Sequence, residues 1–363
     1  MAYTTIDDPS AHFQTTLYTG AGANTVVTNG GNSDLKPDFL WIKNRTAGYA
    51  HFVVDSNRNI SYAQNSSNAP YLETDSTAAE NNNQNWMQSV NTDGFTTGIS
   101  EHTNCNSGSA YVAWQWKANA GTTSSNTDGG ITTTVQTNTD AGFSIVTYAG
   151  TGTTNTIGHG LGVAPDMMIV KNRSGAYDWA VYHKDSNSSP EDYYAQLNTG
   201  NAFSLATDIF GTSSATSSVI GVKNFNETNA SGSNYVAYCF ASKQGYSKFG
   251  SYIGNGNANG PFIYTGFKPA WVMIKSSSTS SSWLMFDNKR TISNGDMDYL
   301  LANSSSAESD DGLGNSAPID FLSNGFKLKN ADLWANGSGQ TYIYMAFAEN
   351  PFVTSTGVPT TAR

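Results

Sequence analysis

The chain has 363 residues and a formal net charge of −10 at pH 7. Its 18 Lys and Arg residues form no basic run, which argues against a nucleic-acid surface. No apolar stretch approaches the ~18 residues of a membrane span, and the first residues lack the basic start and apolar core of a signal peptide. We therefore expect no nucleic-acid partner and no membrane insertion.

The composition favours an all-β fold. Aromatic residues are 12% of the chain and charged residues 13%, about half of the roughly 25% usual in globular proteins. Much of the remainder is Gly, Ser, Thr and Asn, which form turns and are weak helix formers. Cys105 and Cys239 stand at unrelated positions, which argues against a disulfide or a zinc site.

Three anchors recur in the same order along the chain. The first is a Tyr-x-Gly-x-Gly motif that begins at Tyr18, Tyr148 and Tyr252. The second is a Pro followed six positions later by a Lys: Pro37 and Lys43, Pro165 and Lys171, Pro269 and Lys275. The third is a strand-like segment that ends in an aromatic residue: Tyr111–Trp116, Tyr235–Phe240, Tyr342–Phe347. The similar spacing of these anchors indicates three copies of one folding unit.

We therefore predict an all-β protein with three tandem antiparallel β-sandwich repeats of jelly-roll or lectin-like type. The predicted units are residues 1–118, 142–243 and 244–350. Residues 119–141 are expected to be an extended linker or a strand lying across a neighbour, and residues 351–363 a C-terminal arm docked on this chain or on another subunit.

Each unit is expected to contain six or seven short strands. In the middle copy the β-branched and aromatic runs predict these strands: Phe143–Tyr148, Met167–Lys171, Trp179–His183, Tyr193–Leu197, Val219–Val222, Tyr235–Phe240. The last segment of each copy is apolar on one face and nearly so on the other. Such a strand belongs in the middle of a sandwich, away from its rim.

The Tyr-x-Gly-x-Gly motif is interpreted as a backbone bend. A dinucleotide-binding loop needs a third Gly and a following helix, and the residues that follow here have no helical period. Glycine after a strand allows a sharp turn of the chain.

Asp55, His183 and Asp287 occupy equivalent positions in the three copies. A catalytic site needs its groups together beside a nucleophile, so we favour strand-end residues that bond to turn backbone. Convergence of the three positions around a pseudo-threefold axis stays open.

Acidic pairs in polar segments are interpreted as solvated, although glycoside hydrolysis also uses paired carboxylates. These pairs are Glu73 with Asp75, Glu191 with Asp192, and Glu308 with Asp310 and Asp311. Calcium ligands at Asp296 and Asp298, or at Asp310 and Asp311, are weakly indicated because neither set forms an EF-hand loop. We predict no enzyme activity, no catalytic residue, no cofactor and no metal site.

Loop aromatics are the remaining candidates for ligand binding. Tyr62, Trp86, Tyr177 and Trp334 lie in loop contexts, where exposed rings stack on sugars. Local packing is the alternative interpretation for each of them.

Several stretches carry a resemblance to a known family: Met1–Ser10, Tyr111–Ala118, Gly142–Tyr148, Lys243–Tyr252, Met345–Phe352. With these residues the chain resembles virion-surface repeat proteins from tailed bacteriophages of marine bacteria. The resemblance covers essentially the whole chain. It implies a structural or tail-fibre-like protein with no assigned active site.

Three functions follow as expectations. The first is a tail-fibre or appendage protein that contacts the host surface, supported by the resemblance and by aromatic and Asn-rich loops. The second is a capsid decoration (cement) protein, since the predicted units begin almost at Met1 and leave no coiled-coil shaft. The third is a glycan-binding or glycan-degrading module, which lacks a matched acid pair.

The expected location is the virion, after assembly in the reducing cytoplasm of the host bacterium, which fits the scarce cysteines. The expected partners are other virion proteins, further copies of this chain (a trimer is one option) and a host-surface glycan.

Overall fold

The computed structural model describes residues 2–58, 69–83, 86–103, 106–211, 213–291, 294, 297–308 and 319–360. Within these ranges the regular structure consists of antiparallel strands and of two short 3-10 helices, η1 (Pro9–Ala11) and η2 (Pro190–Asp192). The all-β prediction is confirmed. None of the described helices is long and apolar enough to cross a membrane.

The first part of the chain forms a larger sheet in the order β1-β9-β3-β4, a smaller sheet β2-β8-β7 and the hairpin β5-β6. The strand bounds are β1 Phe13–Thr19, β2 Thr25–Val27, β3 Phe39–Asn44, β4 Phe52–Asp55, β5 Ala69–Tyr71, β6 Asn81–Asn83, β7 Met87–Val90, β8 Phe95–Thr97 and β9 Ala110–Trp116.

The second part forms a larger sheet in the order β10-β11-β12-β19-β14-β15-β16-β17 and a smaller sheet β13-β18. The strand bounds are β10 Ser124–Asn126, β11 Thr133–Asn138, β12 Phe143–Ala149, β13 Asn155–Gly158, β14 Met167–Asn172, β15 Trp179–His183, β16 Tyr193–Gln196, β17 Ser204–Leu205, β18 Val219–Val222 and β19 Asn234–Phe240.

The third part forms a larger sheet in the order β20-β27-β22-β23-β24 and a smaller sheet β21-β26-β25. The strand bounds are β20 Ser247–Ile253, β21 Phe262–Tyr264, β22 Phe267–Ser276, β23 Leu284–Asp287, β24 Leu300–Leu301, β25 Ile319–Leu322, β26 Gly325–Leu328 and β27 Thr341–Pro351.

One pairing order recurs in the larger sheets: β1-β9-β3-β4, β12-β19-β14-β15 and β20-β27-β22-β23. The registers match as well, because Phe13 pairs with Trp116 where Phe143 pairs with Phe240 and Ser247 with Phe347. In each case the predicted closing strand lies between two partners, as expected. The six strands predicted in the middle copy are all present, with ends shifted by at most one residue. The domain boundaries themselves stay a prediction.

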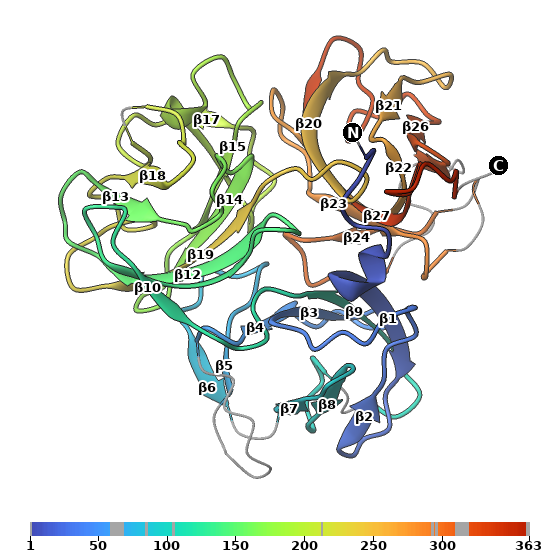
Figure 1. Cartoon of the computed structure of the whole chain (residues 1–363), viewed down its shortest axis with the longest axis horizontal. Coiled ribbons are helices and arrows are strands. Elements are labelled where there is room, and N and C mark those ends of the chain that lie inside the picture. Colours follow the sequence, from blue (N-terminus) through green and yellow to red (C-terminus); the bar gives the residue numbers. More distant parts are fainter. Residues whose placement is uncertain are drawn as a thin grey trace.

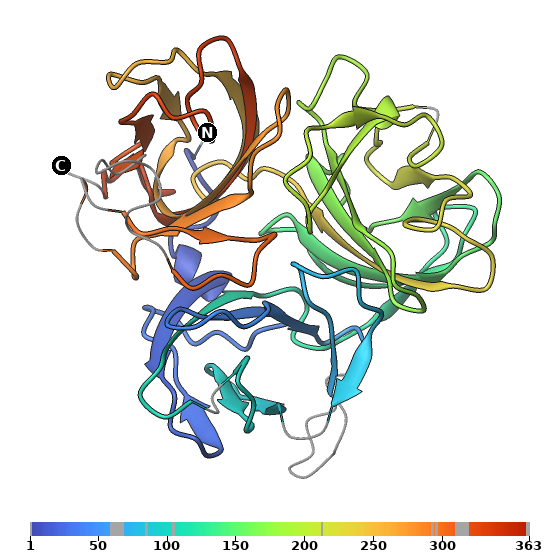
Figure 2. The same cartoon turned by 180° about the vertical axis from the view of Figure 1, so that it is seen from behind.

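The three larger sheets face a common centre, and the smaller sheets lie on the outside (Figures 1 and 2). Side chains from all three sheets form one central cluster, which includes Trp114, Trp116, Tyr238, Trp271 and Phe347. Separate apolar clusters fill the space between each larger sheet and its smaller sheet. On β9, for example, Trp114 points to the shared centre and Tyr111 to the interior of its own pair of sheets.

The glycines of the Tyr-x-Gly-x-Gly motif shape the turn after each first strand. A Cβ atom on Gly20 would collide with the carbonyl oxygen of Asn106, and Gly150 and Gly254 face equivalent carbonyls. The second glycine, Gly22 in the first copy, has a positive φ of 67°, which favours glycine over other residues. The motif is therefore a backbone bend, as predicted.

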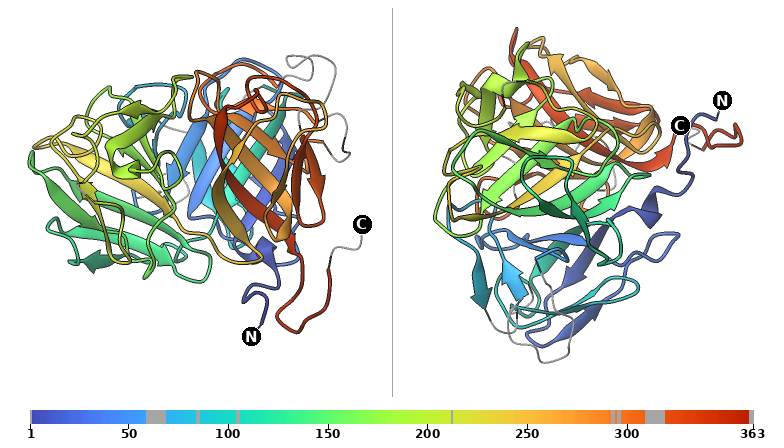
Figure 3. Two further views of the ribbon diagram at one scale, coloured as in Figure 1. Left: turned by 90° about the horizontal axis from the view of Figure 1, so that it is seen from above. Right: turned by 60° about the vertical axis from the view of Figure 1, so that its left-hand side comes forward.

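The segment at residues 119–141 contains β10 and β11, and β11 pairs with β12 along the edge of the second sheet. Of the two options for this segment, the structure shows the strand. Residues near both ends of the chain lie on the same side of the molecule (Figure 3). There the Asp7 carboxylate accepts hydrogen bonds from the backbone N–H and hydroxyl of Ser355.

Candidate functional site

Asp55, His183 and Asp287 each lie where the end of one larger sheet meets the next sheet. Tyr238 of β19 donates a 2.6 Å hydrogen bond to the Asp55 carboxylate of β4. Trp114 of β9 donates a 3.1 Å bond to Asp287 of β23, and the His183 ring lies 3.4 Å from the Tyr344 carbonyl of β27. The sheets thus meet in a cyclic order, with one member of the trio at each junction.

The trio also bonds to turn backbone, as the sequence suggested. Asp55 accepts from the N–H of Arg58, Asp287 accepts from the N–H of Arg290, and His183 accepts from the N–H of Asp185. These bonds fix the turn that follows each strand. All three side chains are fully buried. None of them is available to a solvent-borne substrate.

Two junctions are tied by buried ion-pair clusters. Arg58 contacts Asp55 at 2.5 Å and Glu80 at 3.0 Å, and Glu80 also receives two 2.8 Å bonds from Arg173 of the second sheet. Burial alone would raise the pKa of Glu80, but the hydrogen bonds and charges of the two arginines lower it. Glu80 therefore remains charged and joins the first part of the chain to the second.

The same arrangement recurs between the third part of the chain and the first. Arg290 contacts Asp287 at 2.5 Å and Glu308 at 2.6 Å, and Glu308 contacts Arg45 at 2.6 Å. Glu308 was interpreted as a solvated loop acid, and this is wrong: it joins two arginines across a junction. An enzyme could not use this carboxylate as a general acid while it remains paired twice.

The junction between the second and third parts has a different composition. Its equivalents of Arg58, Glu80 and Arg173 are Ser186, Phe203 and Ser277, and the Phe203 N–H bonds to the Ser277 carbonyl. Burial lowers the pKa of His183 to about 4. In this junction neutral residues therefore stand where the other two have the ion-pair cluster.

The repeated lysines, which the sequence marked only as an alignment anchor, are buried at the same junctions. Lys43 donates to carbonyls of Asn44, Ala47 and Ser305, and Lys171 donates to three carbonyls in the same way. Burial lowers the pKa of both amines to about 8. Lys275 donates to the Ser276 carbonyl at 2.7 Å, and burial lowers its pKa to about 7.

A signal for these contacts exists within the sequence. Asp55 and Asp287 are each followed three positions later by an Arg, whereas His183 is followed by Ser186. The charged partner thus changes together with the charged strand-end residue between copies. This joint change indicates the two arginines, which the sequence prediction lacks, whereas no comparable local signal indicates Glu80.

The other acidic pairs do not form one site. Asp75 accepts a 2.9 Å bond from the His51 N–H, and burial raises the pKa of both Glu73 and Asp75. Glu191 is bonded to the Ser214 hydroxyl at an exposed position. Among the described residues, no three His, Cys, Asp or Glu side chains gather as a metal site. Asp296, Asp310 and Asp311 lie outside the described residues, and Asp298 accepts a bond from Thr291.

The candidate aromatics lie in separate places. Trp86 is half-buried and stacks on His102 and Tyr71 in the first part of the chain. Trp334 is half-buried beside Tyr299 in the third part, and Tyr177 belongs to the second. Tyr62 lies outside the described residues. The structure does not bring the three described rings together, and their role in binding stays a prediction.

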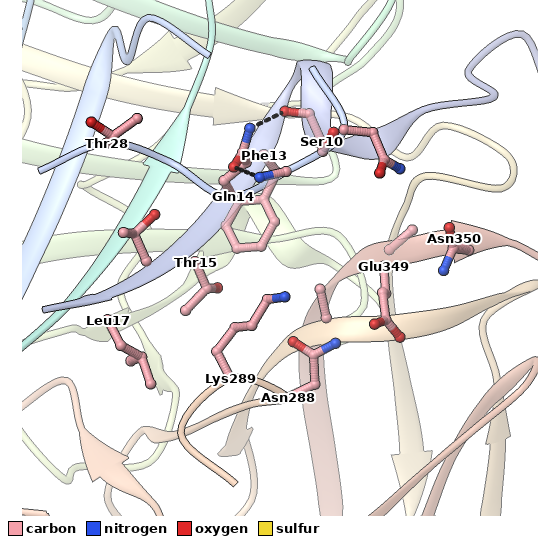
Figure 4. A pocket seen from close by; sticks show the side chains of 16 residues that line it. Ser10, Phe13, Gln14, Thr15, Leu17, Thr28, Asn288, Lys289, Glu349 and Asn350 are labelled. Carbon is pink, nitrogen blue, oxygen red and sulfur yellow. Dashed lines mark hydrogen bonds between the residues drawn. The ribbon is translucent and has the colours of Figure 1, made fainter. Parts of the chain in front are cut away.

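A slot of about 560 Å³ opens between β1 and the third part of the chain (Figure 4). β1 forms one wall with Phe13, Thr15 and Leu17, and Asn288 with Lys289 forms part of the other. Inside the slot the Thr15 hydroxyl and the Asn288 amide oxygen are buried, and neither has a hydrogen-bond partner within the described chain. The slot is a candidate binding site because it lies against β1, an edge strand, and has two buried unpaired polar atoms in its walls.

No curated protein matches the chain. A family model described as a domain of unknown function, DUF7483, matches residues 8–351, a span that includes all three larger sheets. The chain therefore belongs to the DUF7483 family.

Proposed function

We propose that this chain is a non-enzymatic structural protein of a bacteriophage virion, exposed on the particle as an appendage that contacts the host surface. The proposal starts from the resemblance of Met1–Ser10 and the later repeat segments to virion-surface proteins. It is supported by how the chain uses its reactive side chains.

The observation that carries the proposal is the position of the repeated polar residues. Asp55, Arg58, His183, Asp287 and Arg290 are buried at junctions between sheets, where they bond to one another, to backbone or to rings of the next sheet. The polar residues that recur between the copies therefore hold the three larger sheets around one centre. Such a body suits a role in which stability and loop presentation matter.

The outward side of each part of the chain consists of a smaller sheet and its loops (Figure 1). Exposed apolar side chains occur there, as at Val26 of β2 and Phe262 and Tyr264 of β21. Under the proposal these outer surfaces meet the host envelope or its glycans. Trp86, Tyr177 and Trp334 then act mainly by supporting the loops that carry the contact.

A capsid decoration protein is the second candidate. It is favoured by the position of residues 2–8, residues 352–360 and the slot on one side of the body. One such side could attach to a capsid lattice while the other surfaces face solvent. Copy number separates the candidates, because decoration needs about one copy per capsid subunit and an appendage needs a handful.

The experiment is to purify particles of a phage that carries this chain and to measure the chain by quantitative mass spectrometry, with labelling by antibody in electron microscopy. We expect the chain in intact particles, with label at the tail. Label over the whole head would favour decoration. A chain that is abundant in infected cells and absent from purified particles would contradict the proposal.

A further inference from the structure

The three equivalent sheet edges, at β1, β12 and β20, differ in one respect. β12 has a partner on each side, β19 and β11, whereas β1 pairs only with β9 and β20 only with β27 in the described chain. By register, Thr15 of β1 corresponds to Ile145 of β12, because Phe13 corresponds to Phe143. Ile145 pairs with Gln136 of β11. The position opposite Thr15 is therefore where a further strand would lie.

In the second sheet, β11 pairs with β10 on the side away from β12, and the turn after β4 also bonds to it. The Ser56 hydroxyl donates a 2.6 Å bond to Gln136, and the Asn57 amide donates a 2.9 Å bond to the Thr134 carbonyl. β11 thus covers the edge of β12 and is also bonded by polar side chains of the turn after β4. A strand at such a junction therefore pairs with a sheet edge and accepts hydrogen bonds from side chains of the neighbouring turn.

The slot beside β1 has the same two walls without the strand. Asn288 is the equivalent of Ser56, since its N–H bonds to the carbonyl of Ala270 as that of Ser56 bonds to Asp38. Asn288 and Lys289 face Thr15 and Leu17 across the slot (Figure 4). The buried Thr15 hydroxyl and Asn288 amide oxygen lack the bonds that a strand would supply.

A single substitution between copies explains why the slot stays open at its end. The Asp38 carboxylate binds the N–H groups of Ala118, Ala120 and Gly121, which directs the chain after β9 into the next junction. The equivalent residue in the third part of the chain is Ala270, which has no such acceptor. The chain after β27 is therefore not turned inward.

From these observations we propose that the slot binds an extended strand, and that the strand is the segment Phe352–Thr360 of a second copy of this chain. The order of the fold supports this occupant: the segment after β9 supplies the strand at the next edge, and the segment after β27 is its counterpart for the edge of β1. In the structure that counterpart joins no sheet. It contains only the isolated bridge between Val353 and Pro359.

The dimensions fit. The slot runs along Phe13–Leu17, about 17 Å at ~3.4 Å per residue. Phe352–Thr360 reaches about 30 Å when extended, so it can fill the slot and leave a connection. The segment protrudes, with Val358 57% exposed. Glu349 and Asn350, which precede it, line the slot itself, so a two-fold axis would let each copy insert its segment into the other.

The test uses the full chain and a block in the slot. Gly30 lines the slot, and a Cβ atom built on it would meet nothing within 4 Å. Gly30→Trp therefore adds a bulky ring to the lining of the slot, and Gly30→Ala is the matched control. Sedimentation velocity over a concentration series should show self-association of the parent and of Gly30→Ala. We expect Gly30→Trp to associate at least about tenfold more weakly, with an unchanged circular dichroism spectrum.

A cross-linking experiment identifies the segment that enters. Gly30→Cys and Val358→Cys are each made in a background in which Cys105 and Cys239 are replaced by Ser. The two single-cysteine variants are mixed and oxidised, and a covalent dimer is expected only in the mixture. A chain that carries both cysteines and cross-links to itself as a monomer would overturn the proposal, because the segment would then fill its own slot. Equal association of Gly30→Trp and Gly30→Ala, or a parent that stays monomeric throughout the series, would overturn it as well.

Discussion

The hydroxyl of Tyr238 donates a 2.6 Å hydrogen bond to the carboxylate of Asp55, and this bond joins the central strand of one sheet to the edge of another. Both side chains are buried, so water does not readily replace either partner when the bond is lost, and the loss is costly. Trp114 and Asp287 repeat the relationship at the next junction, at 3.1 Å. Tyr238 in one copy and Trp114 in another thus each donate a hydrogen bond to an Asp of the adjacent sheet.

Removal of the hydroxyl should be costly because the bond is to a charged acceptor. Tyr238→Phe is expected to lower the free energy of unfolding by about 2 kcal/mol, the range for hydrogen bonds to ionised groups. Tyr148→Phe is the matched control, since its hydroxyl bonds to a neutral acceptor, the Thr228 carbonyl, at 2.6 Å. Its expected cost is about 1 kcal/mol. Urea unfolding measures both, and a smaller loss for Tyr238→Phe than for Tyr148→Phe would contradict the account.

The ion-pair clusters give a larger effect. Arg290→Met leaves the carboxylate of Asp287 without its buried counter-ion and is expected to cost about 4 kcal/mol. Lys329→Met removes an exposed partner of Asp320 and should cost less than about 1 kcal/mol. Chemical denaturation of the two variants compares them directly. Similar losses for both would show that the buried cluster is not a tie between the sheets.

The three buried lysines should respond differently to the same substitution. Lys43→Met removes the bonds of the amine to the Asn44 and Ser305 carbonyls and should destabilise the protein by about 2 kcal/mol. Lys275→Met leaves the Ser276 carbonyl without this donor. It also removes a buried amine that has few hydrogen bonds to compensate for its burial in the described chain. It should stabilise the protein by about 2 kcal/mol at pH 7. The opposite order in a denaturation series would refute this interpretation.

The gain from Lys275→Met should depend on pH in a defined direction. Burial lowers the folded-state pKa of Lys275 to about 7 from 10.5, so between these pH values the unfolded chain binds more protons. The free energy of unfolding of the parent therefore rises as pH increases from 7 to 10, and the advantage of Lys275→Met shrinks. Parallel denaturation at pH 7, 8.5 and 10 checks this. An advantage that grows with pH is the contrary result.

His183 gives the corresponding effect in acid. Its folded-state pKa of about 4 lies below the ordinary value of 6.5, so the contribution of the neutral ring is present above pH 6.5 and is lost as pH falls toward 4. The loss is about 3 kcal/mol in full. His183→Gln should remove this dependence, so the stability difference between parent and variant should change between pH 7 and 4.5. A constant difference over that range would contradict a buried neutral His183.

Much of the fold could be predicted from the sequence because each strand carries its own local pattern. Trp179–His183 and Val219–Val222 have the ends that the apolar runs predict. The strand β13 was missed because Asn155–Gly158 is polar and resembles a loop. The strand β11 was one of two options for residues 119–141, because Thr133–Asn138 is polar as well. Their pairing is decided by the neighbouring edge, which the local sequence does not encode.

The junctions were harder to predict for a physical reason. An apolar strand face such as Val112, Trp114 and Trp116 must be buried, but its sequence does not state what covers it. In the structure that face meets two other sheets, and the alternate face with Tyr111 meets the smaller sheet of its own part. The slot depends on Ala270 and on the course of a distant segment, so no single stretch predicts it.

Scanning calorimetry of the full chain tests most directly whether the three larger sheets share one core. Because Trp114, Tyr238 and Phe347 belong to one cluster, loss of any sheet exposes the other two. We therefore predict one unfolding transition with equal calorimetric and van't Hoff enthalpies, which Tyr238→Phe and Arg290→Met each shift as a whole. Two or three separate transitions, with each variant moving only the one that contains its residue, would contradict the account.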